Sequence, residues 1–228
     1  SEKLDILEMP ALERWVLNRI WGMDKLLRQA CEEFAFHALF TELHNFCALD
    51  LSAFYFDIRK DSLYCDRMDD VRRRAARTVL DILFDCLTAW LAPFICFSAE
   101  EAWLARHPNR VPGNSVHLRT FPDIPDTWRD DELAEKWNSL RDVRRVVTGA
   151  LEKERAEKRI GSGLQAAPVV HAPAEIVALF DGIDAAELFI TSGVTFTTED
   201  APSEAFTLEE FGGIAVVSEV KEIFDGII

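Results

Sequence analysis

Apolar residues recur every three or four positions through most of the first 160 residues, which is the spacing of amphipathic helices. After that, shorter apolar runs alternate with turn residues, which predicts short strands around a helix over 174–180. The longer helices expected are 11–30, 32–48, 71–91 and 131–158, with a short one around Trp103. The fold class is therefore expected to be mainly α: a helical bundle, a long helix and a small α/β module.

Turn and cap residues set the expected ends of these elements. Pro93 is expected to end the helix over 71–91, because proline cannot continue a helix. Ser98 to Glu101 has the form of a capping box and is expected to begin the next helix. Gly161 and Gly163 are expected to cap the end of the long helix. The segments 115–118 and 187–190 are expected to be extended.

Net charge changes along the chain. The whole sequence carries −15, but from Ile160 onward twelve acids face one base, a net of −11, which leaves −4 on the first 159 residues. Such an acidic total argues against nonspecific nucleic-acid binding by the whole surface. Together with the change of pattern, it divides the chain into a bundle with an ordered crossing segment (1–129), the long helix and its turn (130–166) and a small acidic α/β module (167–228).

Basic residues gather in two stretches of the less acidic part, 59–77 and 141–159. Arginine suits phosphate because its donors fork onto two oxygens at once. The alternative is a solvated helix face with ion pairs four residues apart, such as Asp69–Arg73 and Glu154–Lys158.

The stretch from Leu49 to Tyr64 contains three adjacent aromatic residues, Phe54, Tyr55 and Phe56. On a helix, neighbouring side chains point about 100° apart, so these three cannot all face one core. Either they hold a helix–helix corner together, or at least one of them contacts another element or a partner.

The sequence offers little for metal or catalytic chemistry. Five scattered cysteines without a Cys-x-x-Cys pair indicate reduced thiols. His37, His44 and Cys47 share one helix face, but no second half of a zinc site accompanies them, so no metal is expected. No nucleophile elbow, phosphate loop or paired catalytic carboxylates occur, so no catalytic residue is expected. Absence of a signal-peptide pattern and of an uninterrupted apolar span favours a cytoplasmic protein with no membrane segment.

Three segments carry a family resemblance: DLSAFYFDIRKDSLYCD, LAPFICFSAEEAW and KWNSLRDVRRVVTGALEKERAEKRIGSGLQA. Together they resemble the anticodon-binding helical domain of class I aminoacyl-tRNA synthetases, most closely the isoleucyl enzymes of bacteria. They stand in the family's order and cover most of residues 8–166, whereas the tail after Ala167 matches loosely. The family's two ATP-handling signatures, His-Ile-Gly-His and Lys-Met-Ser-Lys-Ser, are absent from the chain.

The resemblance implies binding and positioning of the anticodon arm of tRNA, specifically the isoleucine isoacceptors. It implies that catalytic and editing domains of the same polypeptide are the other partners, that the protein is a monomer, and that ATP, magnesium and a zinc module of some relatives belong to the full-length enzyme. No cofactor is expected in this chain. Alternatives are the same region of a valyl or leucyl enzyme, or an acidic helical module that binds protein.

The resemblance also favours an RNA-facing role for the two basic stretches and for exposed aromatics, since unpaired bases stack on aromatic or arginine planes. Phe54, Trp90 and Trp137 are further possible platforms, although tryptophans more often pack in a core. The tRNA-binding candidates are Tyr55, Arg59, Lys60, Arg72, Arg73, Arg144, Arg145 and Lys158.

Overall fold

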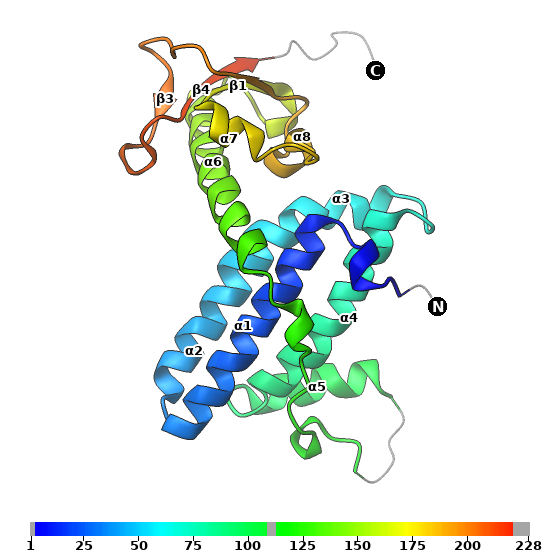
Figure 1. Cartoon of the computed structure of the whole chain (residues 1–228). Coiled ribbons are helices and arrows are strands. Elements are labelled where there is room, and N and C mark those ends of the chain that lie inside the picture. The colour runs from blue at the N-terminus through cyan, green and yellow to red at the C-terminus, as the bar shows by residue number, and fades with distance from the viewer. Residues whose placement is uncertain (1–2, 109–112, 221–228) are drawn as a thin grey trace. The chain divides into compact units, whose positions relative to one another are not determined.

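Helices dominate the protein, and a small sheet follows them near the C-terminal end of the chain (Figure 1). The computed structural model describes residues 3–108 and 113–220. The chain forms two compact units, one through Asp131 and one from Glu132 onward. The fold class expected from the sequence is confirmed: mainly α, with a helical bundle, a long helix and a small mixed module. The finer division into three parts stays a prediction.

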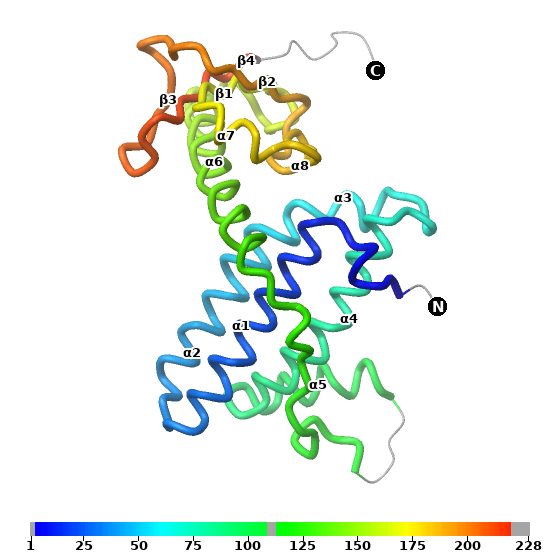
Figure 2. The backbone as a smooth tube through the Cα atoms, in the orientation of Figure 1, coloured from blue at the N-terminus to red at the C-terminus, as the bar shows by residue number. Residues whose placement is uncertain are grey.

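The first unit is a bundle in which α1 packs against both α2 and α4, as the backbone trace shows (Figure 2). Its helices are α1 (Ala11–Glu33), α2 (Phe36–Asn45), the π-helical segment η2 (Phe46–Phe56), α3 (Asp57–Cys65), α4 (Val71–Leu91) and α5 (Cys96–Arg106). Short 3₁₀ turns are η1 (Ile6–Glu8), η3 (Val116–Leu118) and η4 (Asp126–Trp128).

The central aromatic stretch is helical throughout. From Phe36 to Cys65 the chain runs as α2, η2 and α3 without a break. The helix expected from residue 32 instead begins at Phe36, because α1 continues to Glu33 and Phe34 closes it in the left-handed region (φ 58°). π-Helical turns are rare and frequent at functional sites, which makes this segment notable for what it positions.

The ends of α4 match the sequence expectation. Asp70 caps its start, where the side chain accepts a hydrogen bond of 2.8 Å from the Arg72 amide, and the helix ends at Leu91, two residues before Pro93. The capping box expected at Ser98 is wrong, because α5 already begins at Cys96. Glu100 instead accepts hydrogen bonds from the Ser115 hydroxyl (3.0 Å) and the Val116 amide (2.8 Å). These bonds fix Val116–Leu118, which was expected to be extended, as a 3₁₀ turn.

The second unit joins the long helix to a four-stranded sheet. Its elements are α6 (Asp131–Ala156), η5 (Gly163–Gln165), β1 (Ala166–His171), α7 (Ala174–Ala178), α8 (Ala185–Phe189), β2 (Thr195–Thr197), β3 (Phe206–Thr207), η6 (Glu209–Phe211) and β4 (Ala215–Val220). The strand order is β2-β1-β4-β3. β1 pairs with β2 in parallel and with β4 in antiparallel orientation, so Val170 lies opposite both Phe196 and Val216.

The inner face of α6 is formed by apolar residues at helical spacing, and Val143 belongs to it. The expected glycine cap is wrong: the helix ends at Ala156, and Lys158 takes the left-handed conformation (φ 59°). Gly163 is needed for space instead, since a Cβ there would lie 2.7 Å from the Ile190 carbonyl oxygen. The strand expected at 187–190 is also wrong, because Asp184 caps a helix over Ala185–Phe189.

Candidate nucleic-acid interface

Two of the candidate residues, Tyr55 and Arg59, are buried in the first unit. Tyr55 is 0% exposed and Arg59 is 3% exposed. Both side chains bond to the carboxylate of Glu13 on α1. An aromatic ring without exposed surface cannot stack on a base, and a guanidinium that is buried while forked onto a carboxylate presents no edge to a phosphate. The RNA-facing role expected for these two residues therefore does not fit the structure.

Glu13 is the centre of this buried polar cluster. Arg59 donates from Nε to Oε1 (2.7 Å) and from Nη2 to Oε2 (2.9 Å), and the Tyr55 hydroxyl donates to Oε1 (3.1 Å). Burial raises the pKa of Tyr55 well above its usual value, and the negative charge of Glu13 adds to this effect. The phenol therefore stays a donor at neutral pH. The cluster fixes η2 and α3 against α1, and thereby the outward face of α3.

The other candidates of the first unit lie at the surface around the turn between α3 and α4. Lys60 is exposed and pairs with Asp57 at 3.0 Å. The Arg72 side chain is 42% exposed and lies 3.3 Å from Asp66 and 3.7 Å from Asp70, whereas Arg73 donates to the Asp66 carbonyl. The pair expected between Asp69 and Arg73 does not form, because Asp69 pairs with Arg67 at 3.0 Å.

The same turn exposes three residues that the sequence reading did not single out. Tyr64 is 85% exposed, Met68 is 68% exposed, and the Arg67 side chain is 85% exposed. Helical spacing could have indicated Tyr64, because this residue lies four positions after Lys60 and on the same face of α3. The turn between α3 and α4 therefore combines exposed cations with an exposed aromatic ring.

Three candidates lie in the second unit and differ in their surroundings. Arg144 is partly buried and donates to the Leu188 carbonyl at 2.9 Å, so it holds α8 to α6. The Arg145 side chain is 63% exposed and lies 5.8 Å from the Phe211 ring centre and 3.7 Å from Asp142. Lys158 is exposed; the pair expected with Glu154 does not form, since Arg159 takes that carboxylate at 2.8 Å. Whether any of them contacts RNA stays a prediction.

The tryptophans considered as base platforms are buried: Trp90 is 0% exposed and Trp137 is 2% exposed. Exposed aromatic surface lies elsewhere, in part at the turns between α1 and α2 and between α4 and α5. Phe34, just after α1, is 77% exposed, and Phe97, in the first turn of α5, is 91% exposed. Phe40 of α2 packs on Phe94 with ring centres 5.5 Å apart.

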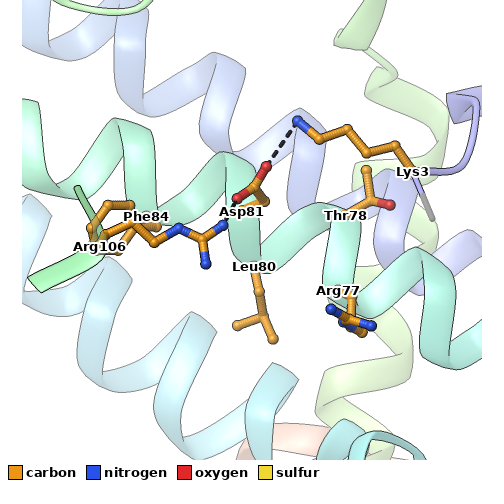
Figure 3. Close-up of a pocket in the computed structure, with 7 residues that line it drawn as sticks. All are labelled: Lys3, Arg77, Thr78, Leu80, Asp81, Phe84 and Arg106. Carbon is orange, nitrogen blue, oxygen red and sulfur yellow. Dashed lines mark hydrogen bonds and ion pairs between the residues drawn. The ribbon is translucent and has the colours of Figure 1, made fainter. Parts of the chain in front are cut away.

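A pocket of about 550 Å³ lies on the first unit between the N-terminal segment, α4 and α5 (Figure 3). Lys3 reaches the Asp81 carboxylate at 2.8 Å from one side and Arg106 reaches it from the other, over a floor that includes Leu80 and Phe84. The hydrogen bond from Lys3, together with the positive charge of Lys3 and Arg106, lowers the pKa of Asp81. These polar groups satisfy one another and join three segments of the fold.

Neither metal nor membrane features appear in the described ranges. No group of three or more His, Cys, Asp or Glu residues there is placed to hold a metal ion. In the same ranges, no helix is long and apolar enough to cross a membrane.

Burial raises the pKa of Cys86 to about 12, so this thiol stays protonated and packs as a small apolar group.

Comparison with known proteins agrees with this reading of the fold. Relatives named isoleucine–tRNA ligase are 47% identical over 97% of the chain in Agrobacterium fabrum and 52% identical over 96% in Ruegeria pomeroyi. A third, from Caulobacter vibrioides, is 49% identical over 93% of the chain. The chain spans only 22–23% of the length of these relatives.

The family described as the anticodon-binding domain of tRNA ligase matches residues 13–171. This range begins in the first turn of α1 and ends with β1, so it includes the bundle from residue 13 onward and the whole long helix. Both basic stretches lie inside it. The chain therefore belongs to the family of anticodon-binding domains of tRNA ligases.

Proposed function

We propose that this chain binds the anticodon arm of isoleucine tRNA as one part of an isoleucine–tRNA ligase. Family membership over 13–171 and close similarity to three isoleucine–tRNA ligases support the substrate class and the amino acid. The structural observation that carries the proposal is a group of exposed cations around the turn between α3 and α4: Lys60 in α3, Arg67 in the turn and Arg72 in α4.

The ion pairs at this turn do not prevent such binding. Exposed pairs of this kind contribute about 0–1 kcal/mol, so exchange of a carboxylate for a phosphate costs little. Guanidinium groups gain two hydrogen bonds from one phosphate, which favours Arg67 and Arg72 as contacts to the RNA backbone. Phosphate contacts would set the orientation of the arm, and a few base contacts would set its identity.

The contribution to the reaction is positioning. Holding the anticodon arm directs the acceptor end of the tRNA to a catalytic domain. The chain contains neither ATP-handling signature, so we assign ATP, magnesium, editing and any zinc module to other parts of a larger ligase. We also propose that this ligase acts in the cytoplasm as a monomer.

Filter binding of transcribed tRNAs across a salt series tests the proposal. Lys60→Ala should weaken binding of all tRNAs and flatten the log–log salt dependence by about 0.7–0.9. Lys25→Ala is a matched control, because the Lys25 side chain is 47% exposed and pairs with Asp126, whereas that of Lys60 is 49% exposed and pairs with Asp57. Binding that does not depend on salt, or that both variants weaken equally, would favour the acidic protein-binding module instead.

A further inference from the structure

Tyr64 stands out among the aromatic residues because the fold makes no use of its ring. It lies in the last turn of α3, is 85% exposed, and makes no hydrogen bond or ring contact with residues 3–108 or 113–220. Met68 (68% exposed) and Val71 (48% exposed) follow it through the turn into α4. Single exposed apolar residues are ordinary, but a group of them at one turn indicates a contact surface.

Two exposed cations lie near this ring, among exposed carboxylates. Lys60 lies one helical turn before Tyr64 on the same face of α3, and Arg67 follows in the turn. Both cations pair only with exposed carboxylates, Asp57 and Asp69, whose side chains are 36% and 72% exposed. A polyanion can therefore displace these carboxylates without opening the core.

The other exposed aromatics lack such surroundings. Phe34 directly follows Glu32 and Glu33, and Phe97 lies shortly before the exposed Glu101. An acidic neighbourhood repels an RNA backbone, whereas an aromatic ring beside lysine and arginine suits a nucleotide, whose base stacks and whose phosphate pairs. The nearby lysine and arginine, rather than the net charge, therefore distinguish Tyr64 from the other exposed rings.

We propose that Tyr64 stacks on an unpaired base of a tRNA loop, while Lys60 and Arg67 bind the phosphates beside that base. The ligand class is a single-stranded nucleotide segment of RNA. This inference rests on the proposed function and adds the residue that contacts a base. The buried Glu13 cluster supports it, because it anchors α3 to α1, so the backbone that carries Tyr64 needs no ordering on binding.

Three variants separate stacking from charge. Tyr64→Ala should weaken binding of an isolated anticodon stem-loop by on the order of tenfold, as loss of one stacked base does, and leave the salt slope unchanged. Tyr64→Phe keeps the ring and should bind like the unsubstituted chain. Phe97→Ala removes a ring of similar exposure (91%) from the acidic surface and should change nothing.

A fully paired RNA duplex of equal length is the second probe. Its bases are unavailable, so Tyr64→Ala should leave its binding unchanged while Lys60→Ala weakens it. If Lys60→Ala weakens stem-loop binding and Tyr64→Ala does not, the stacking proposal is wrong and the proposed function stands. If no salt-dependent RNA binding occurs at all, both are wrong, and the exposed turn contacts protein.

Discussion

Arg59 and Glu13 form a two-pronged ion pair inside the bundle, with N–O distances of 2.7 Å and 2.9 Å, although 46 residues separate them. Their side chains are 4% and 0% exposed. Two charges removed from water in this way contribute little net stability compared with a well-packed apolar pair, but neither tolerates loss of the other. The pair therefore specifies how α3 lies on α1.

Glu13→Gln should destabilise the first unit strongly. It leaves the Arg59 guanidinium buried without its counter-charge, which typically costs about 3–5 kcal/mol. Urea midpoints of the variant and the unsubstituted chain measure the loss. Asp57→Asn breaks the exposed pair with Lys60 and should cost at most about 1 kcal/mol. Equal midpoints for both variants would mean that Arg59 finds another partner or reaches solvent.

Acid should release the contact between Asp81 and Lys3. The hydrogen bond from Lys3 and the nearby positive charge hold the pKa of Asp81 below its usual value in the folded chain. Since the folded pKa lies below the unfolded one, the stability from this carboxylate is complete above the unfolded pKa of about 4 and is lost as pH falls through the folded pKa. Denaturant midpoints of the unsubstituted chain and of Asp81→Asn should therefore differ at pH 7 and converge towards pH 2. A difference independent of pH would show that the carboxylate charge contributes nothing.

Gly163 and Gly161 should respond differently to the same substitution. A methyl group at Gly163 would lie 2.7 Å from the Ile190 carbonyl oxygen, which belongs to the backbone and cannot easily move. Gly163→Ala should therefore cost about 1–3 kcal/mol, as overpacking does. At Gly161 the nearest atom is a side-chain oxygen of Gln165, 3.4 Å away, so Gly161→Ala serves as the matched control with a small effect. Thermal unfolding of the two variants measures the difference.

Hydrophobic spacing was sufficient to predict most of the helices. The stripe of α6 from Leu133 to Leu151 is buried as its periodicity indicates, because the spacing of apolar residues on a helix directly reports its inner face. Caps were less predictable. The Ser98 pattern and the two glycines near 162 match common end signals, but tertiary contacts of Glu100 and Gly163 decide what these residues do.

The candidate site shows the limit of sequence more clearly. Tyr55 and Arg59 lie in a locally basic, aromatic stretch, and nothing in that stretch indicates that both bond to Glu13, 42 and 46 residues away. Tyr64 was not predicted because its exposure could not be inferred from the sequence. A helix pattern predicts which residues share a face, but exposure of that face depends on which other elements pack there.

The interior of α4 offers a test of this distinction. Leu83 is 2% exposed, so Leu83→Ala should cost about 2–5 kcal/mol. Leu87 lies one turn later and is only partly buried. Leu87→Ala should therefore cost clearly less, and urea midpoints would show the order. The reverse order would mean that the partly exposed face of α4 carries more of the packing than its burial indicates.

Arg144 and Arg145 are adjacent on α6, but their substitutions should change different properties: thermal stability for Arg144 and tRNA binding for Arg145. Arg144 holds the Leu188 carbonyl at 2.9 Å, so Arg144→Ala should lower the thermal stability of the second unit by the worth of a charged hydrogen bond, about 1.5–3 kcal/mol. The Arg145 side chain is 63% exposed and paired only loosely with Asp142, so Arg145→Ala should leave stability nearly unchanged. If α6 contacts tRNA phosphates, Arg145→Ala and Lys158→Ala should each reduce the salt slope of tRNA binding by about 0.7–0.9. Slopes unchanged in both variants, at unchanged stability, would confine the RNA-binding surface to the first unit.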